Sequence, residues 1–157
     1  LLQDANPYVQ VYAAEALARL GDPLGRESLQ KTLQHPSRSV AMYAAEAFSN
    51  LGDPAGARRL VEALAPGQEL SARLYAAWTL SRLGDLRGQP VLEELLHSAD
   101  EQVRMQATWT LGQMHGEAAI ASLQRALLDP ARPVRLQAVW ALAFKFRLSD
   151  TRASTGG

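Results

Sequence analysis

The segment YAAEAL (12–17) recurs along the chain and decides its fold. The related segments are YAAEAF (43–48), YAAWTL (75–80), QATWTL (106–111) and QAVWAL (137–142). The steps between their first residues are 31, 32, 31 and 31 residues. Self-similarity at a fixed period of this length is typical of stacked repeats, in which each unit packs mainly against its neighbours. We therefore predict an array of about five matched units.

Turn residues within each unit predict two helices. Gly21 lies where a glycine with positive φ ends a helix, and Asp22 and Pro23 suit the N-cap and the first position of the next helix. That shorter helix is predicted to run to about Leu33, with Leu29 and Leu33 facing inward. The longer helix before it should bury one apolar face at helical spacing, made of Val9, Ala13, Ala16, Leu17 and Leu20.

The composition favours packed helices. The 157 residues include 27 alanines and 25 leucines, and these are the strongest helix formers. β-branched residues are sparse, which argues against a sandwich or a barrel. The predicted fold class is therefore an all-α solenoid.

The repeat units resemble a known family. Their best-preserved features are a Val-Arg pair, a helix of small residues after it and a Leu-Gly-Asp turn, and this order is similar to the HEAT-like repeat named after phycobilisome lyases. The clearest matches are 103–112, 134–142 and the turns that begin at Leu20, Leu51 and Leu83. The resemblance covers residues 1 to about 146 and implies a right-handed α-solenoid of about five two-helix repeats of 31–32 residues.

Two units depart from the family pattern at the arginine of the Val-Arg pair. Gln10 replaces it in the first unit and Ala41 in the second. We therefore expect the ladder of ion pairs between repeats to be incomplete at the N-terminal end.

The predicted domain is a single array over residues 1–148, with incomplete first and last repeats. Residues 149–157 (SDTRASTGG) are predicted to form a disordered polar tail. Leu1 and Leu2 look like the last turn of a missing short helix, so we interpret the chain as a piece of a longer array. We expect the apolar N-terminal end to allow self-association.

The long helices carry an unusual stripe opposite their core face. Tyrosines occupy it in three successive units and tryptophans in the last three, where an ordinary solvated face would hold Glu, Lys and Gln. These aromatic residues either fill the groove between neighbouring long helices or line a concave binding surface. Trp, Tyr, Met and Arg are enriched at interface centres. The predicted partner-binding strip comprises Tyr12, Glu15, Arg19, Met42, Tyr43, Glu46, Tyr75, Trp78, Arg82, Met105, Gln106, Trp109, Gln113 and Trp140.

The sequence shows no set of residues that is typical of catalysis or of metal binding. Without cysteine there is no thiolate zinc site and no cysteine nucleophile. His35, His97 and His115 fall in separate turns and form no ligand set. Glu15 and Glu46 share a register, but exposed acids of this kind are usually solvated, and we expect them instead to meet a basic part of a ligand. We predict no catalytic residue, no metal and no cofactor.

Charge and hydropathy limit the classes of partner. Lys plus Arg and Asp plus Glu both number 16, whereas binding through phosphates usually needs a basic excess, so nucleic acid is not favoured. No apolar run approaches the roughly 20 residues of a membrane helix. No signal segment is visible, and we expect a cytoplasmic protein without a membrane partner.

These observations leave two functions. The first is a non-catalytic scaffold that binds a protein or peptide partner on its aromatic strip. The second is implied by the resemblance: a lyase-type or chaperone-type subunit that handles a bilin or a bilin-carrying protein. The stretch from Tyr75 to Trp78 is similar to aromatic stretches of those lyases, and a planar tetrapyrrole suits a lining of Tyr and Trp.

Overall fold

The computed structural model describes residues 1–153, with side chains up to Lys145, and this part of the chain is helical without strands. A 3-10 turn, Leu86–Gly88, precedes the third short helix. The long helices are α1 (Pro7–Arg19), α3 (Arg38–Asn50), α5 (Leu70–Arg82), α7 (Glu101–Gln113) and α9 (Arg132–Ala153). The short helices between them are α2 (Pro23–Thr32), α4 (Pro54–Ala63), α6 (Gln89–Leu96) and α8 (Glu117–Ala126).

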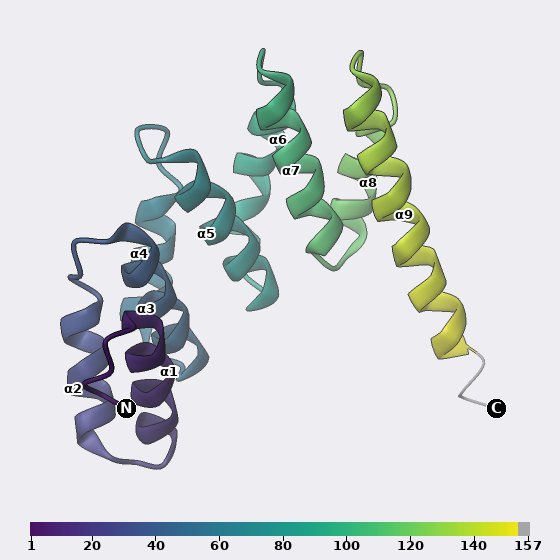
Figure 1. Ribbon diagram of the computed structural model, residues 1–157. Coiled ribbons are helices and arrows are strands. Elements are labelled where there is room, and N and C mark those ends of the chain that lie inside the picture. The colour runs from purple at the N-terminus through teal and green to yellow at the C-terminus, as the bar shows by residue number, and fades with distance from the viewer. Residues whose placement is uncertain (154–157) are drawn as a thin grey trace.

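The helices stack as an extended array. Each long helix packs against the next one, from α1 to α3 and onward to α9, and each of the first four also packs against the short helix that follows it. The two ends of the chain lie at opposite ends of the array (Figure 1). The predicted all-helical solenoid is therefore confirmed.

The turns inside the repeats form as predicted. Gly21, Gly52, Gly84 and Gly116 all have positive φ, between 73° and 103°. Asp22 caps α2 because its side chain accepts a hydrogen bond of 2.9 Å from the backbone of Leu24. The aspartates of the next two turns cap in the same way.

The core is built from leucines that recur at one position of each short helix. Leu29, Leu60, Leu92 and Leu123 are completely buried, which confirms the inward orientation predicted for Leu29. Leu80 of α5 is equally buried in the same cluster. These leucines form one apolar layer between the long and the short helices.

The prediction that the apolar face of the first long helix is buried is wrong. Val9, Ala13 and Leu17 are only half-buried, Ala16 is exposed and Leu20 is 83% exposed. In later repeats the matching face packs against the preceding repeat, and no described helix precedes α1. In α1 the buried residues are instead Val11 and Ala14.

A largely buried arginine, with 12% of its side chain exposed, links the turns on either side of one repeat. The Arg104 guanidinium donates to both carboxylate oxygens of Asp129, with Nε 2.8 Å from Oδ2, and also to the carbonyl oxygen of Ser98. Burial opposes ionisation of Asp129, but the hydrogen bonds from Arg104 and from a backbone amide lower its pKa. At the position of Arg104, the first two repeats hold the uncharged Gln10 and Ala41, whereas Arg73 of the third pairs with Glu94.

The last helix is longer than predicted. α9 continues to Ala153, through the first part of the segment predicted as a tail from residue 149. No glycine or proline lies between Pro133 and Gly156, so the sequence has no strong helix breaker there. Residues 154–157 of the predicted tail lie outside the described residues.

The core assignment predicts unequal losses of stability for two leucines. Leu80→Ala should lower the free energy of unfolding by about 2–5 kcal/mol, because it leaves a cavity in a fully buried cluster. The matched change Leu20→Ala, at an exposed site, should cost less than about 0.5 kcal/mol. Urea unfolding followed by circular dichroism measures both, and equal losses would contradict the assignment.

Candidate functional site

The predicted strip runs along the long helices, and in its N-terminal half neighbouring helices are bridged by contacts between rings. Tyr12 and Tyr43 have ring centroids 6.4 Å apart, Tyr43 and Tyr75 lie 5.1 Å apart, and Tyr75 and Trp78 lie 5.8 Å apart. Tyr8 also meets Tyr43 edge to face. Here the aromatic residues pack against one another across the groove between neighbouring long helices, in partial agreement with the first of the two interpretations, although Tyr12 is 58% exposed.

Both glutamates of the strip are already paired with neighbours. Glu46 of α3 accepts hydrogen bonds from the Tyr75 hydroxyl and the Arg82 guanidinium, both on α5. Glu15 of α1 accepts from Arg19 at 2.6 Å and from Asn50 of α3 at 3.2 Å. The expectation that these carboxylates await a basic part of a ligand is therefore corrected, because their charges are already compensated across the helix junctions.

The pair with Glu46 also changes the acidity of Tyr75. Burial is the larger cause and the hydrogen bond to the Glu46 carboxylate the next, and together they raise the pKa of Tyr75. The Arg82 guanidinium carbon lies 5.1 Å from the centroid of the Trp78 ring, within the range of a cation–π interaction. One arginine thus contacts both the acid and the first tryptophan.

The C-terminal half of the strip is open. Trp109 is 55% exposed and Trp140 is 73% exposed. Between α5 and α7 lies a groove of about 420 Å³, whose walls are almost wholly apolar and come chiefly from Leu74, Tyr75, Trp78 and Trp109. This half corresponds to the second interpretation, a surface available to a partner.

A change of residue at one register position explains why the strip opens. The position of Glu15 and Glu46 is occupied by Trp78 in α5 and by Trp109 in α7. The position of Arg82 is occupied by Gln113 in the next long helix. An indole cannot form the ion pair that joins α3 to α5, so the α5–α7 junction lacks that bridge on its outer side.

The two methionines predicted for the strip belong to the helix packing. Met42 is only 2% exposed and lies in the main core cluster, where it forms part of the floor of a hollow between α3 and α5. Met105 is half-buried and packs against the cluster around Val134 and Ala138. Both side chains face the neighbouring repeat. Each methionine directly precedes a residue of the exposed stripe, so its side chain points toward the junction between two long helices.

Sequence reasoning missed Thr110 as part of the groove lining. It is buried at the α5–α7 junction and yet contributes to the groove wall. A threonine at a core position gives no sequence signal of this kind. Gln106, which was predicted, lines the groove and is exposed.

Two smaller hollows continue the groove toward the N-terminus. One, of about 310 Å³, is bounded by residues of α1, α3 and α5 that include Tyr12, Asn50 and Trp78. The other, of about 220 Å³, lies between α3 and α5 beside Arg38 and Glu69. The long-helix face therefore carries a row of shallow hollows across consecutive repeats.

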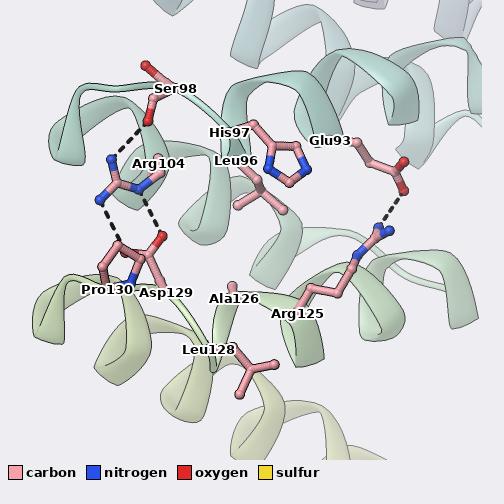
Figure 2. Close-up of a pocket in the computed structure, with 10 residues that line it drawn as sticks. All are labelled: Glu93, Leu96, His97, Ser98, Arg104, Arg125, Ala126, Leu128, Asp129 and Pro130. Atoms are coloured by element: carbon pink, nitrogen blue, oxygen red, sulfur yellow. Dashed lines mark hydrogen bonds and ion pairs between the residues drawn. The ribbon is translucent and has the colours of Figure 1, made fainter.

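A separate hollow lies between the short helices α6 and α8, away from the strip. It measures about 350 Å³. Figure 2 shows the Arg104–Asp129 pair on one side of it, the Glu93–Arg125 pair on the other, and His97 between them. Its charged groups, the histidine apart, compensate one another, so we interpret the hollow as part of the packing between repeats.

The described part of the chain shows neither a metal site nor a membrane span. There, no group of three or more His, Asp or Glu side chains could hold a metal ion. None of the described helices combines the length and the apolar character that crossing a membrane requires.

The comparisons with known proteins agree with this architecture. The family model of HEAT repeats matches residues 1–73 and 58–143. The chain belongs to the HEAT repeat family. HEAT repeats typically form non-enzymatic helical scaffolds, commonly for protein interaction. The match does not single out the phycobilisome-lyase type of repeat, and a search of curated proteins found no match.

The Tyr75–Glu46 contact predicts a pH dependence for this HEAT repeat chain. Because the folded state raises the pKa of Tyr75 above its ordinary value, the stabilisation is present below about pH 10 and is lost as pH rises beyond it. Tyr75→Phe should therefore cost about 1 kcal/mol at neutral pH and progressively less above pH 10. Urea unfolding at a series of pH values measures this difference, and a constant difference would contradict the role of the hydroxyl.

Proposed function

We propose that this HEAT repeat chain is a scaffold that binds an extended segment of a partner protein along its aromatic strip. The anchor of that segment is an uncharged apolar side chain seated between Trp78 and Trp109. The observation that carries the proposal is the apolar groove between α5 and α7, which lies beside an exposed tryptophan. Tryptophans in such positions commonly dominate binding energy at interfaces.

The row of hollows favours a chain-like ligand over a single small molecule. Packed helices are spaced about 8–10 Å apart, and an extended chain rises about 3.3 Å per residue. About three residues of an extended peptide therefore span one repeat, and a longer segment reaches several hollows in turn. A small molecule would fill only one of them.

The charges around the groove define the chemistry of the anchor. Glu46 and Arg82 neutralise each other beside Trp78, and Gln106 is one of the few polar side chains that line the groove. A charged anchor would lose its hydration there without gaining a partner, which is costly. The amide of Gln106 both donates and accepts, so it suits the main chain of an extended peptide.

A second candidate function is the handling of a bilin, or of a protein that carries one. The flat, apolar walls at Tyr75 and Trp78 would also accept a planar tetrapyrrole. The other hollows of the strip have no role in this alternative. The peptide proposal therefore uses more of the observed surface.

Selection from a random peptide library displayed on phage, followed by calorimetric titration of the selected peptides, tests the proposal. We expect enrichment of one aliphatic or aromatic anchor in an otherwise variable segment. Trp109→Ala should weaken binding by about tenfold to thirtyfold, whereas the control Leu86→Ala, at an exposed site away from the strip, should leave it unchanged.

Two results would overturn the peptide proposal. The first is failure to enrich any apolar anchor. The second is binding of the selected peptides that is unaffected by Trp109→Ala. A shift in the visible absorption of biliverdin on mixing with the chain, lost in Trp109→Ala while no peptide is enriched, would favour the bilin function instead.

A further inference from the structure

The hollow between α1, α3 and α5 has a wall of aromatic rings and carboxylates. Its volume is about 310 Å³, and its lining includes Tyr12, Glu15, Tyr43, Glu46, Tyr75 and Trp78. The arginines that pair with the two glutamates lie outside this lining, which contains no Lys or Arg among the described residues. Most of the lining comes from α3 and α5, and each of these helices has a long helix packed on both sides. The wall therefore combines carboxylates with π faces, and most of it belongs to inner repeats of the array.

The rings in this wall are inclined to one another and are not stacked. The interplanar angle is 69° between Tyr12 and Tyr43, 51° between Tyr43 and Tyr75, and 53° between Tyr75 and Trp78. Inclined rings do not cover one another as stacked rings do, so ring faces stay available to a ligand. The face of an aromatic ring is negative and attracts cations within about 6 Å of its centroid. Trp78 already holds one cation in this way, the Arg82 guanidinium.

The hydrogen bonds of the two glutamates decide which kind of cation fits. Both carboxylate oxygens of Glu46 accept hydrogen bonds from α5, and Oε1 of Glu15 accepts two more. The primary ammonium of a lysine has three N–H donors, and it would lose its hydration without finding enough free acceptors. A quaternary ammonium has a permanent positive charge and no N–H donor, so occupied acceptors are no obstacle to it. Aromatic faces are the surfaces that typically recognise such a group.

We propose that the hollow between α1, α3 and α5 binds a quaternary ammonium group. Such a group occurs on a trimethylated lysine of a protein and on small choline-like molecules, and both share the chemistry that this wall recognises. Tyr12 is 58% exposed, so the ligand reaches the hollow from solvent. The proposal does not depend on peptide binding in the α5–α7 groove, although Trp78 lines both sites.

Proton NMR titration of the chain with choline, at constant ionic strength, tests the proposal. The N-methyl resonance should move upfield on binding, because ring currents shield protons that lie over aromatic faces. The carbon isostere of choline, in which a tert-butyl group replaces the trimethylammonium, has the same shape without the charge. It should bind at least about tenfold more weakly than choline.

A second pair of probes distinguishes the two sources of the group. The amide of Nα-acetyl-trimethyllysine should bind more tightly than that of Nα-acetyl-lysine, because only the first lacks N–H donors on its side-chain cation. Tighter binding of the trimethyllysine probe than of choline would indicate a modified protein as the ligand. The reverse order would indicate a small molecule.

Variants at Tyr12 and Glu15 separate attraction of the cation from simple packing. Tyr12→Leu removes a ring face at an exposed site and should weaken choline binding by about threefold to tenfold, whereas Tyr12→Phe keeps the face and should bind like the wild type. Glu15→Gln keeps the shape of the side chain and removes its charge, so it should also weaken binding. The control Trp109→Ala lies outside the hollow and should leave choline binding unchanged. Because the same change should weaken peptide binding, failure of one proposal is distinguishable from failure of the other.

Three results would overturn the ammonium site. These are equal binding of choline and its carbon isostere, no saturable shift of the N-methyl resonance at millimolar choline, and equal binding by Tyr12→Leu and Tyr12→Phe. Circular dichroism checks that each variant is folded. If Tyr12→Leu is not, unchanged binding by Glu15→Gln would contradict the proposal in its place.

Discussion

Close packing between consecutive long helices is the constraint on which the rest of the structure depends. At each junction a completely buried alanine, such as Ala44, Ala76 or Ala107, faces the preceding repeat. Small side chains let the helix axes approach and leave no room for larger residues. This spacing brings equivalent positions of neighbouring helices into contact, so that a residue repeated in the sequence becomes a continuous column in space.

The character of the aromatic strip follows from the residue that each long helix places in it. In α1 and α3 the column holds tyrosines and acids that bond across the junction to the next long helix, as the Glu46–Arg82 pair does, and only small hollows remain there. From Trp78 onward the acid is replaced by an indole, the bridge is absent, and an apolar groove opens toward Trp109. The same scaffold thus supports contacts between helices at one end of the strip and an open apolar groove, the proposed binding surface, at the other, without any change of fold.

Much of the fold could be predicted from the sequence, because its signals are local. Gly21 and Asp22 define a turn, and Leu29 recurs once in each repeat. The buried face of α1 could not be predicted, because its residues are buried only where another repeat covers them. Whether Met42 faces outward depends on a small rotation of α3 about its own axis, smaller than the angle between two successive residues. The pairing of Glu46 depends on side chains of the next helix. Local pattern does not determine such contacts.

The central claim is that each repeat gains its stability from the repeats on both sides of it. Amide hydrogen exchange, at a concentration low enough to keep the chain monomeric, tests this most directly because it reports local opening for each helix. Our account predicts that the amides of α1, which has a neighbour on one side only, exchange faster than those of α3 and α5. Protection of α1 equal to that of α5 would contradict it.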